Sequence, residues 1–154
     1  DWAKAELARL NEAGIPDRIF PLFRLWGDLR CIDAAIDPSD RKANHCYRGN
    51  PALANRTPSI GRANTLKTWL NMWSLETSPC QGAPHLAKHD TPALVVQGLG
   101  DTGVFPSDAQ KIYEFLGSAD KELHLIKGAH YFEDSEEERQ AAADLVGEWI
   151  RTKI

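Results

Sequence analysis

Two short apolar segments near the end of the chain constrain its fold more than any other feature. Ala93 to Val96 is a continuous apolar run, and Leu123 to Ile126 is a second segment that resembles a strand. A run of this kind is typical of a strand that is covered on both faces. The helical pattern from Ser107 to Leu116 between them predicts two parallel strands joined by a right-handed crossover. Because two strands do not make a stable sheet alone, we expect residues outside this chain to complete the sheet.

The chain divides into two parts with different patterns. Residues 1–90 show helices and polar loops without a convincing strand, and residues 91–154 alternate strand and helix. In the first part we expect a helix from Trp2 to Ala13, a broken helical region over 17–36, a polar loop over 37–58 and a helix from Ser59 to Ser74. In the second part, Ser107 with Gln110 and Ser135 with Glu138 have the spacing of capping boxes, which predicts where the two helices begin.

Composition and charge exclude several functional classes. Apolar residues make up 42% and charged residues 26% of the chain, which is ordinary for a globular protein. The net charge is −4 and there is no basic stripe, which argues against binding of nucleic acid. Apolar runs are far shorter than the roughly 20 residues of a membrane helix, so we expect no membrane span. The absence of a signal-peptide pattern, and three cysteines without a CxxC pair, favour the cytoplasm.

One acidic residue and one histidine follow the two predicted strands. Asp101 lies just after the first strand and His130 just after the second. Ligands of open parallel sheets bind beyond the carboxyl ends of the strands, where both side chains are expected to emerge. A carboxylate beside a histidine there would fix the imidazole tautomer, as in a catalytic triad. The alternatives are an ordinary turn aspartate and a loop histidine, while Asp108 fits a structural role in the first turn of a helix.

These segments resemble a known family. Thr91-Pro-Ala-Leu-Val-Val-Gln-Gly-Leu-Gly-Asp101-Thr-Gly-Val-Phe-Pro106 resembles the penultimate strand and acid turn of α/β-hydrolases. Leu125-Ile-Lys-Gly-Ala-His130-Tyr-Phe resembles the last strand and histidine loop of that family. The resemblance implies an α/β fold in which residues 91–154 are the C-terminal two strands and two helices of a mostly parallel sheet. Residues 1–90 would then be the helical cap that precedes them.

The family also implies a nucleophile that this chain does not supply. In α/β-hydrolases the nucleophile lies on a sharp strand-to-helix turn, usually G-x-S-x-G, and precedes the acid and the histidine. Thr57-Pro-Ser59-Ile-Gly61 and Ser78-Pro-Cys80-Gln-Gly82 are half matches, and neither follows a strand. We therefore expect the nucleophile and the oxyanion hole in the N-terminal half of the hydrolase core, as a preceding segment or as a separate chain.

The resemblance implies an esterase-like hydrolase that acts on a small to medium acyl substrate. His130 would deprotonate the nucleophile and protonate the leaving group, and Asp101 would orient His130. Three alternatives remain open. The first is an epoxide or haloalkane hydrolase with an aspartate nucleophile. The second is a binding or regulatory module that kept the fold without the nucleophile. The third is a free-standing helical domain followed by an unrelated βαβα unit.

Aromatic residues of the cap are candidates for an apolar substrate pocket, because some cap aromatics face the active-site mouth in this architecture. The candidate pocket residues are Phe23, Trp26, Trp69, Trp73 and Val104. The histidines and cysteines between residues 45 and 89 match no common zinc spacing. We therefore expect neither a metal nor a cofactor.

Overall fold

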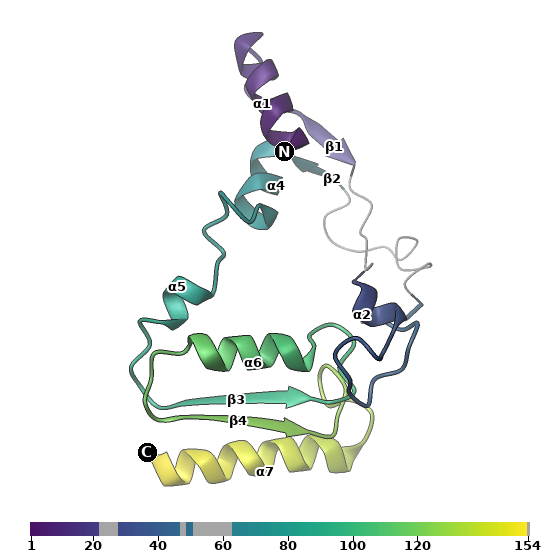
Figure 1. The fold of residues 1–154 in the computed structure, drawn as a ribbon, viewed down its shortest axis with the longest axis vertical. Coiled ribbons are helices and arrows are strands. Elements are labelled where there is room, and N and C mark those ends of the chain that lie inside the picture. The colour runs from purple at the N-terminus through teal and green to yellow at the C-terminus, as the bar shows by residue number, and fades with distance from the viewer. Residues whose placement is uncertain (22–27, 47–48, 51–62, 154) are drawn as a thin grey trace. The chain divides into compact units, whose positions relative to one another are not determined.

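The computed structural model combines helices with short strands in two compact units (Figure 1). It describes residues 1–21, 28–46, 49–50 and 63–153. Unit 1 consists of Asp1–Arg24 and Thr57–Gln81, and unit 2 of Leu25–Arg56 and Gly82–Ile154. Three residues named in the predictions, Phe23, Trp26 and Ser59, lie outside the described residues. The division of the chain at residue 90 into a cap and a hydrolase core therefore stays a prediction.

The described residues of unit 1 form two helices and a two-stranded antiparallel sheet. Its elements are α1 (Trp2–Glu12), β1 (Ile19–Pro21), β2 (Ala63–Thr65) and α4 (Leu66–Trp73). Ala3, Leu10 and Leu66 form its buried centre, and Leu66 is fully buried. The predicted first helix is confirmed, with its end near Glu12.

The strands of unit 1 correct two predictions. The helical region expected over 17–36 is wrong, because Ile19–Pro21 is a strand and only Leu29–Ile32 (α2) is helical among its described residues. Of the helix expected over 59–74, residues 59–62 lie outside the described residues, Ala63–Thr65 is the strand β2, and the helix α4 begins at Leu66. A distant side chain helps to set this start, since the Asp17 carboxylate accepts hydrogen bonds from the N–H groups of Leu66 and Lys67 at 3.0 and 3.3 Å.

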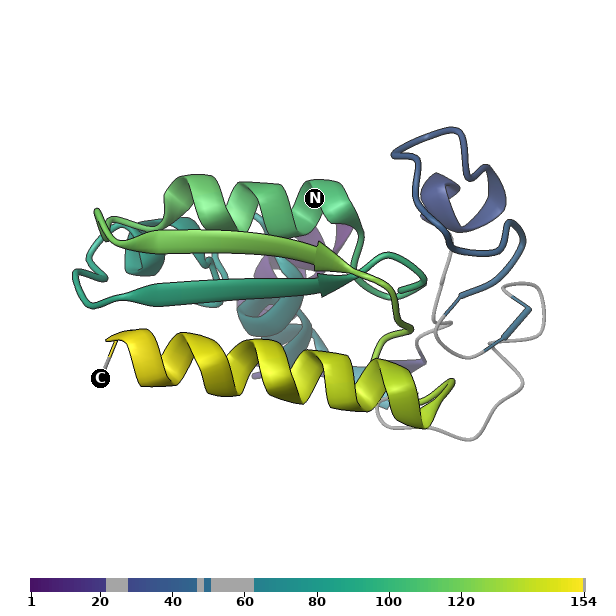
Figure 2. The same cartoon turned by 90° about the horizontal axis from the view of Figure 1, so that it is seen from below.

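Unit 2 contains the predicted parallel pair. The strands β3 (Ala93–Gly98) and β4 (Lys121–Ile126) run parallel, with Ala93 opposite Lys121 and Gly98 opposite Ile126. Two helices, α6 (Pro106–Phe115) and α7 (Glu136–Lys153), cover opposite faces of this pair (Figure 2). The short helix α5 (Ala83–Leu86) packs against α6. The parallel strands and the helix between them are therefore confirmed.

The two helix starts in unit 2 differ in outcome. Glu138 donates its backbone N–H to the Ser135 hydroxyl at 3.2 Å, which is one of the two hydrogen bonds of the predicted capping box, while its carboxylate pairs with Lys127 at 3.3 Å. The predicted cap at Ser107 is wrong, because α6 begins at Pro106 and the Asp108 carboxylate accepts from the Phe105 N–H at 3.1 Å. Proline is favourable at this first helical position, where its missing N–H costs nothing.

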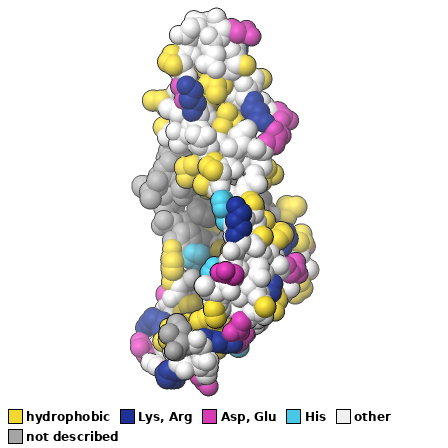
Figure 3. All heavy atoms as spheres, turned by 90° about the vertical axis from the view of Figure 1, so that its left-hand side faces the viewer, with side chains coloured by type: hydrophobic (Ala, Val, Ile, Leu, Met, Phe, Trp, Pro, Cys, Tyr) yellow, Lys and Arg dark blue, Asp and Glu magenta, His cyan; other side chains and the backbone are white. Residues whose placement is uncertain are grey.

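Large apolar side chains remain exposed in both units, as the face in Figure 3 illustrates. In unit 1, Trp73 is 60% exposed and Leu75 is 92% exposed. Along α4, Leu66 is therefore buried and Trp73 is exposed. Within the described ranges, no helix is long and apolar enough to cross a membrane.

The Glu6 carboxylate of α1 gives unit 1 a testable pH dependence. It accepts hydrogen bonds from Arg9 at 2.8 and 3.0 Å and from Arg18 at 2.8 Å. These bonds, chiefly the ones from Arg9, lower the pKa of Glu6 from 4.5 to about 2. A lowered folded-state pKa stabilises the fold above pH 4.5, and this contribution is lost as the pH falls toward about 2.

We therefore expect Glu6→Gln to lower the free energy of unfolding of unit 1 at neutral pH but not near pH 2. Urea unfolding followed by tryptophan fluorescence at several pH values measures the difference. Glu12→Gln makes the same charge change on the same helix and serves as the control. A difference between wild type and Glu6→Gln that stays constant from pH 7 to pH 2 would contradict the assignment.

Candidate active site

The loops that follow β3 and β4 are joined by backbone hydrogen bonds beyond the ends of the strands. Leu99 donates its N–H to the Ile126 carbonyl at 2.8 Å, and Gly100 donates to the Gly128 carbonyl at 2.8 Å. The ladder of the parallel pair thus continues into the two loops. Asp101 and His130, each the next functional residue along its loop, are held at the same edge of the sheet.

Asp101 and His130 are in direct contact. His130 Nδ1 lies 3.0 Å from Oδ1 and 2.9 Å from Oδ2 of Asp101. Asp101 is 5% exposed, whereas the His130 side chain is partly open to solvent. An ionised carboxylate only accepts hydrogen bonds, so this contact requires a proton on Nδ1. The structure brings together the two residues that the sequence selected, 29 positions apart, and their catalytic roles stay predictions.

The Asp101 carboxylate is also held by its own turn. Its Oδ1 accepts the backbone N–H of Gly103 at 2.6 Å and that of Val104 at 3.0 Å. The side-chain amide of Gln97 lies 3.5 Å from the other oxygen, Oδ2. Hydrogen bonds to the charged form compensate for the cost of burying a carboxylate. The turn therefore presents an oriented anion to the histidine.

The histidine loop approaches β3 so closely that only glycine fits. A Cβ atom at Gly98 would lie 2.5 Å from the Gly128 carbonyl oxygen and 2.8 Å from that of Ala129. Gly128 has a φ of +149°, and a Cβ there would meet the Phe132 ring at 2.3 Å. Phe132 itself has a φ of +53°, which is unusual for a bulky residue and is typical of functional loops. The loop is thus packed in one defined position.

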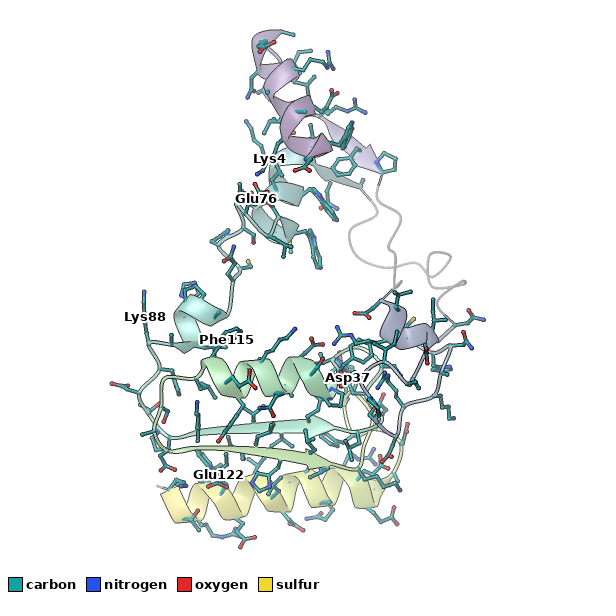
Figure 4. The ribbon with its side chains drawn as sticks, in the orientation of Figure 1. Lys4, Asp37, Glu76, Lys88, Phe115 and Glu122 are labelled. Atoms are coloured by element: carbon teal, nitrogen blue, oxygen red, sulfur yellow. The ribbon has the colours of Figure 1, made fainter. Side chains whose placement is uncertain are left out.

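A segment from the first half of the chain packs against the acid turn. The Phe105 ring, 3% exposed, lies close to two guanidinium groups, with Arg30 at 4.1 Å and Arg41 at 5.0 Å from the ring centroid. Asp37, labelled in Figure 4, accepts the Ser107 N–H at 3.0 Å. We call residues 28–46 the strap, because they hold the turn between Asp101 and α6 from outside.

Charge and thiol groups of the strap add to this contact. Arg30 pairs with Asp28 at 2.7 Å and with Asp108 at 3.1 Å, and the pairing with Asp28 chiefly raises the pKa of Arg30. The Cys31 thiol donates a long hydrogen bond to the Thr102 carbonyl at 3.7 Å. Burial raises the pKa of that thiol, so it stays protonated at neutral pH. Asp108 therefore has the structural role that its place in the first helical turn predicts.

The predicted pocket residues fall in different places. Val104 lies in the acid turn and contributes its backbone to Asp101, while its side chain is half-buried. Trp69 and Trp73 belong to unit 1, where their rings lie 6.0 Å apart. They line a cavity of about 350 Å³ together with residues of α1, among them Trp2. A role for these residues in binding substrate stays a prediction. Among the described residues no group of three His, Cys, Asp or Glu side chains could hold a metal ion.

Sequence reasoning missed several residues that shape the site. Gln97 is the polar residue within the otherwise apolar β3, and that break in pattern was a usable signal. The strap gave no such signal, because Arg30 contacts Asp108 across 78 positions. Phe105 also gave no signal, because its contacts with Arg30 and Arg41 join distant parts of the chain. Contacts at this separation follow from packing and not from local pattern.

The surroundings of Gly98 and Gly147 predict opposite effects on stability when each glycine is replaced by alanine. Gly98→Ala is expected to push the Gly128–Ala129 backbone away, to weaken the His130–Asp101 contact and to destabilise the protein by roughly 1–3 kcal/mol. Gly147→Ala, within α7, places a Cβ no closer than 3.6 Å to Arg151 and is expected to stabilise by up to about 1 kcal/mol. Urea unfolding and the ¹⁵N ring shifts of His130 measure both effects. If Gly98→Ala changes neither the stability nor the His130 signal, a Cβ at residue 98 does not clash with the Gly128–Ala129 backbone.

No protein-family model, no curated protein and no solved structure matches this chain. The chemistry of the described residues is therefore the guide to function. The most informative group is the buried carboxylate of Asp101, hydrogen-bonded to the ring of His130 at the carboxyl ends of two parallel strands.

Proposed function

We propose that this chain carries the acid and the base of an esterase-like hydrolase of the α/β-hydrolase superfamily. The observation that supports this proposal most directly is the contact of His130 Nδ1 with both oxygens of Asp101. The substrate would be a small to medium acyl compound. The nucleophile would lie in the N-terminal half of the core, outside this chain.

The chemistry follows from the tautomer that Asp101 imposes. With the proton on Nδ1, the other ring nitrogen, Nε2, carries the lone pair that can accept a proton. Nε2 of His130 would take the proton of the nucleophile as that atom bonds to the acyl carbon, and would return it to the leaving group. Water would then release the acyl group by the same exchange. Asp101 stabilises the imidazolium formed in each step and stays ionised throughout.

Three features of unit 2 support a sheet that continues beyond β3. Leu94, Val95 and Val96 are only partly buried, although helices lie on both faces of the strand pair. Val146 and Ile150 of α7 are 39% and 44% exposed, so part of this helix is free to cover a further strand. The third feature is the edge of β3 that faces away from β4, which has no neighbouring strand in the described sheet.

The register shows which backbone groups a further strand would use. Ala93 and Leu99 donate their N–H groups toward β4, to Asp120 and Ile126. Because N–H directions alternate along a strand, the N–H groups of Leu94 and Val96 face the other edge of β3. In the described sheet that edge has no neighbouring strand.

The catalytic proposal is tested in the full protein, by which we mean this chain together with the residues that complete its sheet. His130→Ala is expected to lower kcat for p-nitrophenyl ester hydrolysis by about 10²- to 10⁴-fold, because the general base is lost. A fluorophosphonate probe is expected to label an activated serine in the wild type. His124→Ala is the matched control, since His124 lies on the neighbouring β4 and pairs with Glu122.

Absence of fluorophosphonate labelling, combined with unchanged ester hydrolysis in His130→Ala, would overturn the serine-hydrolase proposal. Absence of labelling with loss of hydrolysis in His130→Ala would instead indicate a nucleophile other than serine. In that case the acid–base roles and the esterase activity would stand, and only the assignment of a serine nucleophile would fall.

Hydrogen exchange tests the open edge separately. In the 154-residue chain alone, the amides of Leu94 and Val96 are expected to exchange much faster than those of Val95 and Gln97, which face β4. In the full protein all four are expected to be protected. Equal protection of the four amides in the isolated chain would mean that β3 needs no further neighbour.

A further inference from the structure

Gln97 places a side-chain amide inside the acid turn. It is the second-last residue of β3 and is 5% exposed. Its Nε2 lies 2.8 Å from the Gly98 carbonyl oxygen, 3.1 Å from that of Val104 and 3.5 Å from Asp101 Oδ2. The amide therefore spans the whole turn, from the end of the strand to the residue before Phe105.

The surroundings leave only one orientation for this amide. The nitrogen and oxygen of a glutamine amide are alike in shape, so their positions are decided by their partners. All three neighbours of Nε2 are acceptors: two carbonyls and one carboxylate. An amide oxygen in that place would face three oxygens, so the donor NH₂ group must occupy it.

The carboxylate of Asp101 needs such a constraint. Rotation about the Cβ–Cγ bond of aspartate has a broad energy profile, so the plane of the carboxylate is not fixed by the side chain alone. The N–H groups of Gly103 and Val104 hold Oδ1. Oδ2 is shared by His130 Nδ1 at 2.9 Å and by the Gln97 amide. Gln97 also holds the Val104 carbonyl, and so fixes the backbone whose N–H reaches Oδ1.

We propose that Gln97 is a positioning residue for the Asp101–His130 pair. Its amide donates to the Gly98 and Val104 carbonyls and so holds the backbone whose N–H groups orient the Asp101 carboxylate, and thereby favours one tautomer and orientation of the His130 ring. The catalytic consequence rests on the function proposed above. The effect on the His130 ring is a property of the pair itself and is measured without any hydrolysis.

Two variants of nearly equal size separate the donor role from packing. Gln97→Leu keeps the bulk and removes the donor, whereas Gln97→Glu keeps the shape and turns a carboxylate toward Asp101. Gln140→Glu is the matched control, because Gln140 donates its Nε2 to the Asp144 carboxylate at 2.7 Å on the exposed face of α7. It makes the same chemical change in the same kind of contact, away from the turn.

The first readout is the ¹⁵N spectrum of the His130 ring in the full protein. In the wild type and in Gln140→Glu, the ring is expected as the tautomer with its proton on Nδ1. Gln97→Leu is expected to show a mixture of the two His130 tautomers. Gln97→Glu is expected to shift the ¹⁵N signals of the ring further from their wild-type positions. A His130 spectrum that is unchanged in both Gln97 variants, with β3 amides still protected, would overturn the proposal.

The second readout is the kinetics of ester hydrolysis. A hydrogen bond to a charged group corresponds to roughly ten- to a hundredfold in an equilibrium or rate constant. We expect Gln97→Glu to lower kcat by about this factor and to leave KM nearly unchanged, because the pair acts in the chemical step. A rise in KM with unchanged kcat would overturn the positioning role.

A double substitution excludes a general loss of packing. When Asp101 is replaced by Asn, the repulsion that Gln97→Glu introduces is removed. The further effect of Gln97→Glu on the His130 spectrum is therefore expected to disappear in the Asp101→Asn background. An equal effect in both backgrounds would show that Gln97 acts only through packing. Should the wild type lack esterase activity, the function proposed above fails while these spectra still decide the role of Gln97.

Discussion

The site depends on two backbone hydrogen bonds that extend the parallel ladder past its last residues. The bonds from Leu99 to Ile126 and from Gly100 to Gly128 join two loops that are distant in sequence. Because Gly98 has no side chain, the histidine loop can lie directly against the end of β3. The geometry of the candidate pair is thus a property of the main chain, and the side chains only complete it.

The burial of Asp101 shows how the surrounding structure supports that geometry. An isolated carboxylate in this position would carry a desolvation cost of several kcal/mol, and would give up its charge. Backbone N–H groups, an amide and the imidazole ring surround it instead. The strap holds the far end of the same turn through Phe105, which lies close to Arg30 and Arg41. A turn held from both ends keeps its carboxylate in one orientation, as an acceptor for the imidazole must be.

The parts of the structure that the sequence predicted are those that depend on local pattern and one topological rule. An apolar run, a helical stripe and a second strand gave the parallel pair, and the sheet-edge rule then brought Asp101 to His130. The parts that it missed depend on distant contacts. Ile19–Pro21 is a strand because β2 pairs with it, although the local pattern predicted a broken helical region there. The start of α6 was misplaced because the Asp108 carboxylate caps it, in place of the serine that the pattern favoured.

The same register that positions the pair also bears on where the proposed nucleophile would lie. A strand added at the open edge of β3 would lie about 4.8 Å from it and, if parallel, would end at the edge where Asp101 emerges. Val146 and Ile150 of α7 are partly exposed, so this helix has apolar surface left to cover such a strand. The N–H groups of Leu94 and Val96 face the same edge, which has no neighbouring strand in the described sheet. On the function proposed above, we therefore expect the further strand beside β3, at the edge where Asp101 emerges.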